Sequence, residues 1–388
     1  MWITSVSLTA LTIFKKYHQL IVVLVFFINT ASAQTSATHD SADPLVVLGQ
    51  QLFFDTDLSF NRTQSCASCH DPARAFTDTR VNPFNAAASI GADGASLGDR
   101  QAPSLSYAAQ TPDLHEVEEG VFAGGYFWDG RASSLEQQAT SPLYSPVEMA
   151  LPDASVLKER LFEKDAYKNA FSALFGNNVW NEADALNNAF SSAVAAFQRT
   201  SLFSPFDSRY DRYLRGEYKP TLRETIGMGL FFSQGFANCS HCHQLNTLPN
   251  SPGETFSNYQ YENIGLSVNG ALREANGKGA DYIDGGFMQQ GRFKVPTLRN
   301  VAVTAPYMHN GIFNELRTVL LFYNKFNTTG GTSQINPETQ QPWGEPEVDA
   351  QRNMEKLNGG IPLSRLHMEA LEAFMRMLTD QQYEHLLP

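Results

Sequence analysis

Two short clusters of cysteine and histidine are the residues in this chain whose types and spacing could do chemistry. The pattern Cys-x-x-Cys-His occurs twice, at Cys66, Cys69 and His70 and again at Cys239, Cys242 and His243. In such a pattern each thiol can form a thioether with one haem vinyl group, and the histidine can bind the iron. The spacing therefore predicts two covalently attached haem c groups, with His70 and His243 as the proximal iron ligands.

Zinc half-sites and thioredoxin-like redox pairs also use Cys-x-x-Cys. The two motifs contain all four cysteines of the chain, which leaves no further cysteine to complete a zinc site and none for a separate disulfide. Two copies of the whole five-residue pattern therefore favour haem attachment. His241, inside the second motif, is interpreted as a surface residue.

A tandem repeat surrounds the two motifs. Four features occur twice in the same order: Gly-x-x-Leu-Phe-Phe at 49–54 and 227–232, Pro-x-Leu at 103–105 and 296–298, Asp-Gly or Asn-Gly at 129–130 and 310–311, and then Leu135 and Leu316. Self-similarity at matched positions indicates a duplicated structural unit. We therefore predict two tandem cytochrome c-like haem domains.

The elements between the motifs are expected to be mainly helices joined by long loops. Residues 181–197 carry apolar side chains at the spacing of a one-sided helix, and Pro205 follows as a stop signal. We place the domains at 34–204 and 205–388. A second amphipathic stretch includes Leu371, Phe374 and Leu378, whereas residues 82–100 are rich in Ala, Gly, Ser and Asp and are typical of a long loop.

The N-terminal sequence and the net charge indicate where the protein acts and which partners it can bind. Two lysines, an apolar run at 20–28 and the sequence Ala31-Ser32-Ala33 predict a signal peptide over 1–33 and a periplasmic mature chain. The run is too short for a membrane span, which needs about 20 apolar residues. The formal charge of -12 argues against nucleic acid as a partner but permits docking of a basic protein.

The remaining motifs resemble one known family. They are Phe-Trp-Asp-Gly-Arg at 127–131, Gln138, Pro142, Pro-Val-Glu-Met at 146–149 and Thr-Ala-Pro-Tyr-Met-His-Asn-Gly at 304–311. In this order they resemble the bacterial di-haem cytochrome c peroxidases and their relative MauG, over essentially the whole mature chain. The resemblance implies an exported di-haem peroxidase.

The resemblance also implies roles for single residues. The haem held by His70 would react with peroxide, with Glu148 as its acid/base catalyst, Gln138 as a polar pocket group and Pro142 as an inert filler. Trp128 would lie between the two haems and relay electrons. A carboxylate suits the task given to Glu148, because it can accept a proton from one oxygen and deliver it to the other. Solvent exposure of Glu148 and plain core packing of Trp128 are the alternatives.

The branches of the family differ in the ligand that each haem iron has on the side away from its proximal histidine. Many members close the peroxidatic haem with a loop histidine, but residues 82–110 contain none, and His115 is the only nearby candidate. The first haem is therefore expected to be open. The second haem is closed by methionine in cytochrome c peroxidases and by tyrosine in MauG. Tyr323 stands at that position, with Met308 as the competing ligand.

The resemblance implies a calcium ion between the domains, held partly by the backbone carbonyls of Thr304 and Pro306. Gln101 stands where the family has an asparagine ligand, so its amide oxygen would reach the ion on a longer arm. MauG also has a surface tryptophan two residues before the second motif, where this chain has Ala237. Oxidation of a distant protein would therefore need a different exit route.

The sequence thus predicts a MauG-like peroxidase that uses hydrogen peroxide to oxidise a partner and transfers electrons between its haems. The partner is a small cytochrome or cupredoxin that donates electrons, or a protein that is oxidatively modified. Two alternatives stay open: a cytochrome c peroxidase that detoxifies peroxide, and a non-enzymatic electron carrier. Monomer and homodimer are equally compatible with the sequence.

Overall fold

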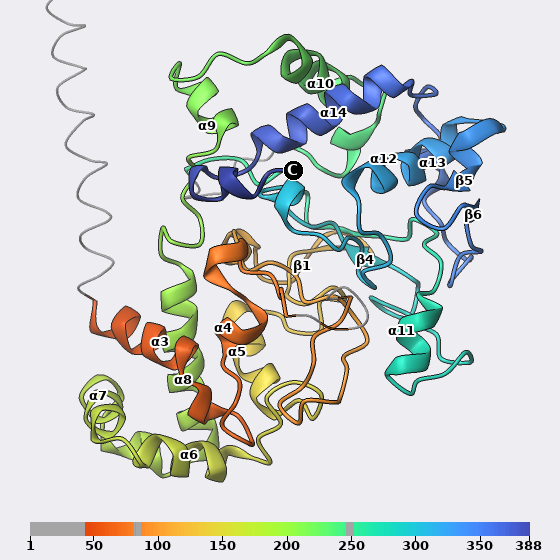
Figure 1. The fold of residues 1–388 in the computed structure, drawn as a ribbon. Coiled ribbons are helices and arrows are strands. Elements are labelled where there is room, and N and C mark those ends of the chain that lie inside the picture. Colours follow the sequence, from red (N-terminus) through yellow and green to blue (C-terminus); the bar gives the residue numbers. More distant parts are fainter. Residues whose placement is uncertain (1–42, 81, 83–86, 246–251) are drawn as a thin grey trace, which may run out of the picture.

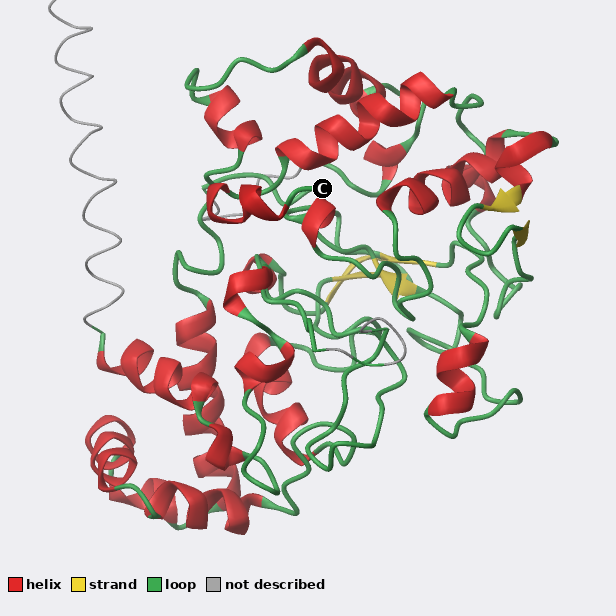
Figure 2. Ribbon diagram, in the orientation of Figure 1, coloured by secondary structure: helices red, strands yellow, loops and turns green. Residues whose placement is uncertain are grey.

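The computed structural model describes residues 43–80, 82, 87–245 and 252–388, and these are mainly helical (Figure 2). The predicted mainly helical fold is therefore confirmed. The signal peptide predicted for residues 1–33 lies outside the described residues. Within the described part of the chain, the structure has no helix that is long and apolar enough to cross a membrane.

Among the described residues, six helices precede residue 204. They are α3 (Pro44–Phe54), α4 (Cys66–Cys69), α5 (Leu135–Tyr144), α6 (Ala154–Phe162), α7 (Asp165–Phe175) and α8 (Ala183–Gln198). Helix α3 begins at a typical signal, because Asp43 accepts a hydrogen bond from the Leu45 amide at 2.8 Å and Pro44 needs no partner for its nitrogen. Helix α8 matches the helix predicted for residues 181–197.

The described part of the second half contains six more helices. They are α9 (Arg209–Leu214), α10 (Leu222–Phe232), α11 (Gly270–Ala275), α12 (Leu316–Asn324), α13 (Met354–Leu357) and α14 (Arg365–Met377). Thr221 and Glu224 form a capping box at the start of α10, and Ser364 and His367 form one at the start of α14. The predicted C-terminal amphipathic stretch is therefore α14, followed at once by the buried Leu378.

Short elements connect these helices. Single 3-10 turns are η1 (Thr56–Leu58), η2 (Pro72–Arg74), η3 (Ala108–Gln110), η4 (Asn177–Trp180), η5 (Cys239–His241), η6 (Val301–Val303), η7 (Lys325–Asn327), η8 (Gly331–Gln334) and η9 (Gln381–Leu386). Three antiparallel pairs are β1 (His115–Glu118) with β2 (Val121–Ala123), β3 (Tyr261–Glu262) with β4 (Phe293–Lys294), and β5 (Ile335–Asn336) with β6 (Gln341–Pro342). The described part of the predicted loop at 82–100 contains no helix.

The two halves repeat one helix crossing. Helix α3 packs on α8 in the first half, and α10 packs on α14 in the second (Figure 1). A Cβ added at Gly49 would collide with the carbonyl of Ala193, and a Cβ at Gly227 would collide with that of Ala370. The repeated glycine of the sequence is thus the position at which two helix backbones touch, because only glycine leaves room for such an approach.

Buried apolar side chains form two main cores. One core is built from residues between 48 and 203, and the other from residues between 210 and 378. The boundary predicted near residue 204 falls in the interval between them. This arrangement supports the tandem-domain organisation, which nevertheless stays a prediction.

The end of the chain lies between the two halves (Figure 1). The Tyr107 hydroxyl, from the first half, donates to Asp380 Oδ1 at 2.6 Å, and Asn300 donates to Asp380 Oδ2 at 2.8 Å. The Tyr383 hydroxyl donates to the carbonyl of Pro72 at 3.0 Å. These contacts join the two halves of the chain.

Candidate functional site

The first motif lines one cavity in the first half. Helix α4 carries Cys66 and Cys69 at its two ends, and His70 follows it directly. Side chains from α5 and the turn after it face the same cavity, namely Gln138, Pro142 and Glu148. The structure therefore brings together all the residues that the sequence assigned to the peroxide-reacting side.

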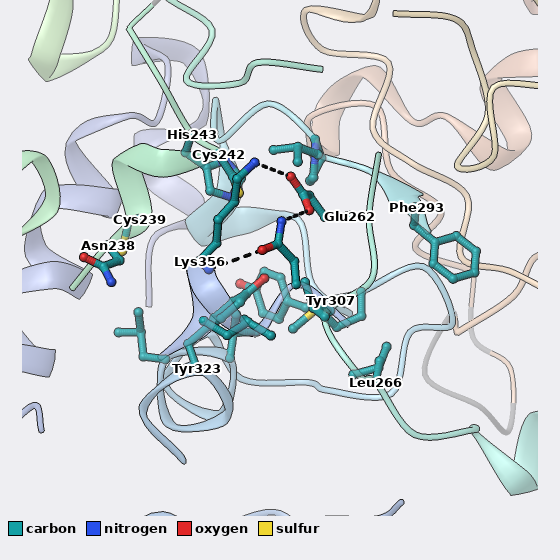
Figure 3. Close-up of a pocket in the computed structure, with 18 of the residues that line it drawn as sticks. Asn238, Cys239, Cys242, His243, Glu262, Leu266, Phe293, Tyr307, Tyr323 and Lys356 are labelled. Carbon is teal, nitrogen blue, oxygen red and sulfur yellow. Dashed lines mark hydrogen bonds and ion pairs between the residues drawn. The ribbon is translucent and has the colours of Figure 1, made fainter. Parts of the chain in front are cut away.

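The second motif lines another cavity in the second half (Figure 3). Cys239, Cys242 and His243 come from η5 and the residues after it, while Tyr323 comes from α12. Met308 lines this cavity too. Both candidates for the ligand opposite His243 are thus in place. Desolvation raises the pKa of Tyr323 above its usual value.

The two motif histidines are oriented in the same way. Nδ1 of His70 donates to the carbonyl of Phe76 at 3.2 Å, and Nδ1 of His243 donates to that of Phe256 at 2.9 Å. Both phenylalanines have a φ of 56°, in the left-handed region. Desolvation lowers the pKa of each histidine to about 4, so both are neutral near pH 7. Each ring therefore keeps Nε2 and its lone pair for a metal.

The repeat also shows which residues stand at the same place in the two cavities. Pro142 lies seven positions after Leu135 in α5, and Tyr323 lies seven positions after Leu316 in α12. Because the two leucines are equivalent in the repeat, proline in the first half occupies the helix position of tyrosine in the second. Proline has no side-chain group that binds a metal, whereas a phenolate oxygen does.

Glu148 is placed by backbone hydrogen bonds on both sides. Its amide donates to the carbonyl of Ser145 at 3.0 Å, and its carbonyl accepts from the amide of Ala92 at 2.7 Å. The second bond joins the turn that contains Glu148 to the loop that was predicted at 82–100. The half-buried carboxyl has a raised pKa, chiefly because of desolvation. A raised pKa makes the carboxylate a stronger base, which suits a group that must accept a proton before it passes the proton on.

Trp128 lines both cavities. Its indole nitrogen donates to the carbonyl of Gln101 at 2.8 Å, and its own carbonyl accepts from the amide of Lys294 at 2.8 Å. Lys294 also lines both cavities, and desolvation lowers its pKa to about 7. Nothing in the sequence indicated this lysine, since a single charged residue in a short strand is usually exposed.

Arg100 pairs with two carboxylates beside the cavities. Arg100, from the first half, contacts Asp129 at 2.7 Å and Asp284 of the second half at 2.7 Å. Asp284 lines both cavities. His309 lines the second, and within the described residues its buried Nε2 has no hydrogen-bond partner. An unpaired buried donor or acceptor beside a cavity points to a polar ligand group that would satisfy it.

These observations test whether a haem fits each motif. The four cysteines are free, so every thiol is available for a thioether. In each cavity the two thiols and the imidazole with a free Nε2 line one space. The unpaired Nε2 of His309 matches a haem propionate. The residues therefore fit a haem c in each half.

The other predicted residues fall in different places. Gln101 is buried, and its backbone amide donates to the carbonyl of His309 at 2.8 Å. This bond places Gln101 beside the segment that contains Thr304 and Pro306. No group of three His, Cys, Asp or Glu side chains in the described part of the chain could hold a metal ion, so a calcium site there would depend on carbonyl and amide oxygens. His115 is exposed in β1, and the described residues that line the first cavity do not include it.

Comparisons with known proteins agree with this geometry. The family model for di-haem cytochrome c peroxidase matches residues 43–219. The methylamine utilization protein MauG of Paracoccus denitrificans is 48% identical over 366 residues, which cover 92% of this chain and 94% of that protein. The chain belongs to the di-haem cytochrome c peroxidase and MauG family. It is therefore an oxidoreductase of the peroxidase class, in a family that carries two c-type haems.

More distant relatives are also similar to this chain over most of their length. The cytochrome c551 peroxidase of Pseudomonas aeruginosa is 29% identical, with coverage of 74% of this chain and 80% of that protein. The crystal structure of the di-haem peroxidase BthA from Burkholderia thailandensis is similar at a TM-score of 0.77 and 30% identity, and covers 89% of this chain and 88% of that one. The di-haem peroxidase BthA thus shares the fold of this chain.

Proposed function

We propose that this chain is an exported, MauG-like peroxidase that uses hydrogen peroxide at the His70 haem and shares the two oxidising equivalents with the His243 haem. The observation that carries the proposal is the inequality of the two cavities. Pro142 occupies in the first cavity the helix position that Tyr323 occupies in the second. One iron would therefore be open to peroxide, and the other would be closed by a side chain.

Bound haem iron supplies a site for peroxide and accepts the two oxidising equivalents. The protein supplies the proton transfer. The carboxylate of Glu148 would accept the proton from one peroxide oxygen and deliver it to the other, so that the O–O bond breaks and the second oxygen leaves as water. Its raised pKa makes it a stronger base for the first of these transfers. Gln138 adds a polar group beside it, and Pro142 keeps the position free of a competing ligand.

Electron transfer between the halves would pass by Trp128. The indole lines both cavities and is fixed by hydrogen bonds from its ring nitrogen and to its carbonyl. Tyr323 would bind the second iron as a phenolate. An anionic oxygen ligand favours a higher oxidation state more than a thioether does. The second haem would then store one of the two equivalents.

The substrate of this chemistry is a protein. A small cytochrome or cupredoxin would donate electrons, or a partner would be oxidatively modified on its side chains, as expected for a MauG-like member. The charge of -12 suits a basic partner and does not suit nucleic acid. The predicted signal peptide supports a periplasmic location, and a calcium ion held near Gln101 completes the proposed cofactor set.

A cytochrome c peroxidase that detoxifies peroxide is the second candidate. One observation favours it, because Met308 lines the second cavity together with Tyr323. A methionine ligand would raise the reduction potential of that haem and suit it to accept electrons from a cytochrome.

The Tyr323→Phe and Met308→Leu variants separate these candidates. EPR and visible spectra of the holoprotein should show one high-spin and one low-spin haem. We expect Tyr323→Phe to change the low-spin spectrum and Met308→Leu to leave it unchanged. The reverse pattern would establish the methionine-ligated peroxidase, and two low-spin haems with no response to peroxide would establish the electron carrier.

A further inference from the structure

An ion pair lies inside the second cavity, at the end that holds the cysteines (Figure 3). Glu262, in β3, accepts a hydrogen bond from Lys356 Nζ at 2.6 Å through Oε1 and one from Asn353 Nδ2 at 2.7 Å through Oε2. All three residues line the cavity. Both oxygens of the carboxylate are thus fixed by donors from α13 and the residue that caps it.

The two partners differ in their access to water. The Glu262 side chain is 11% exposed, whereas the Lys356 side chain is 32% exposed. Charges interact more strongly where water is excluded, and water and salt screen an exposed charge. The pair therefore has a net negative field on its cavity side, although its formal charge is zero.

This carboxylate faces groups on both sides of the proposed haem. Cys242, on the attachment side, and Tyr323, the proposed ligand on the opposite side, line the same cavity as this carboxylate. The other acids that line the cavity are compensated elsewhere: Asp284 contacts Arg100 at 2.7 Å, and Glu347 contacts Arg273 at 3.1 Å. Arg100 and Arg273 are both more than four-fifths buried, so water screens neither of these pairs as it screens Lys356.

We propose that Glu262, held in place by Lys356 and Asn353, lowers the reduction potential of the second haem. The inference rests on the proposed function, because it places a haem at Cys239 and Cys242. Negative charge near a haem stabilises the oxidised iron, which carries one more positive charge than the reduced iron. Glu262 would thus act in the same direction as a phenolate ligand and would help the second haem to keep an oxidising equivalent. It is a positioning residue and touches no reacting atom.

The test is a potentiometric titration of the purified holoprotein, in which each haem is followed by its visible spectrum. Glu262→Gln should move the potential of the second haem to a more positive value, and Lys356→Gln should move it to a more negative value. The first haem should be unaffected in both variants. Glu369→Gln is the matched control: Glu369 is 19% exposed and paired with Arg365 at 3.0 Å in α14, and it does not line the cavity. The control should leave both potentials unchanged.

Shifts of opposite sign in the reduction potential of the two variants distinguish an electrostatic role of Glu262 from a purely structural one. Loss of either partner would loosen β3 from α13, so a structural role predicts potential shifts in the same direction for both variants. That result, or no shift in Glu262→Gln, would overturn the proposal. If Glu262→Gln does not fold, the Lys356→Gln variant decides. A more negative potential of the second haem would support the proposal, and an unchanged potential would contradict it. A wild-type protein that does not react with hydrogen peroxide would contradict the proposed function alone, because the potentials are measured without peroxide.

Discussion

Side chains of the same type have different roles in this protein because of what surrounds them. Glu148 and Glu136 lie close together in the chain, but Glu148 lines the first cavity and has a raised pKa, whereas Glu136 pairs with Arg199 at 2.6 Å and has a lowered pKa. For Glu136 the arginine partner outweighs desolvation. For Glu148 desolvation is the larger effect. Only Glu148 is therefore suited to hold and release a proton.

We expect Glu148→Gln to slow the reaction with hydrogen peroxide by about 10²–10⁴-fold, the usual contribution of a positioned acid/base group. Only the ionised carboxylate accepts the first proton, so the rate in the native protein should rise with pH through a pKa that lies above the usual value for glutamate. Stopped-flow absorbance over a pH series measures both effects.

Glu136→Gln is the control, since this glutamate is on α5 but does not line the cavity. It should keep the native rate and the native pH profile. A Glu148→Gln variant that retains the pH-dependent limb would show that another group moves the proton.

Some residue roles were accessible from the sequence and others were not. The motif residues and Tyr323 stand at fixed spacings, and spacing along a helix determines which cavity a side chain faces. Glu262 and Lys294 gave no such signal. Each is a single charged residue in a two-residue strand, and only the pairing of distant segments shows that both line a cavity.

At the scale of elements, the repeated glycine was visible in the sequence but its reason was not. Gly227 is the contact point of α10 with α14, while Gly229, two residues later in α10, has open space around its Cβ position. An amphipathic pattern predicts α14 by itself. It does not predict where α14 crosses α10, because crossing depends on residues far apart in sequence.

Gly227→Ala should lower the free energy of unfolding by about 1–3 kcal/mol or more, because the added methyl group meets the carbonyl of Ala370 and forces the helices apart. Gly229→Ala should instead raise it by roughly 0.5–1 kcal/mol, as alanine is a better helix former than glycine. Urea denaturation of the two holoproteins, followed by circular dichroism, compares them directly. Equal effects of the two substitutions would mean that the crossing is not close-packed.

At the scale of the whole molecule, the site depends on how the halves meet. Trp128 lines the cavities of both halves, and Asp380 near the chain end accepts hydrogen bonds from Tyr107 and Asn300. Tyr107 and Asn300 are equivalent in the repeat and share a φ of 61°. The sequence predicted two similar domains, but the contact between them could not be read from a repeat. A repeat relates equivalent positions of the two copies and does not show which residues of one copy meet the other.

Tyr107→Phe should lower the free energy of unfolding by about 1–3 kcal/mol, because a buried carboxylate oxygen loses its donor. Desolvation raises the pKa of Asp380 to about 6, so ionised Asp380 weakens the fold as the pH rises from its usual pKa of 3.8 through 6. The hydrogen bond from Tyr107 favours the ionised form of Asp380. The cost of the substitution should therefore be larger at neutral pH than in mild acid.

Denaturant titrations at several pH values measure this cost. Tyr144→Phe is the comparison, since the Tyr144 hydroxyl donates to Asn187 within the first half at 2.5 Å. Its cost should be smaller and independent of pH. A Tyr107→Phe penalty that does not change with pH would show that Asp380 is not linked to the contact between the halves.

The central claim is that the two haems are unequal but react as one unit. The most direct measurement adds one equivalent of hydrogen peroxide to the oxidised holoprotein and records the EPR signals of both haems after rapid freezing. We predict that the high-spin signal of the His70 haem and the low-spin signal of the His243 haem disappear together. Loss of the high-spin signal alone, with the low-spin signal intact, would contradict the account.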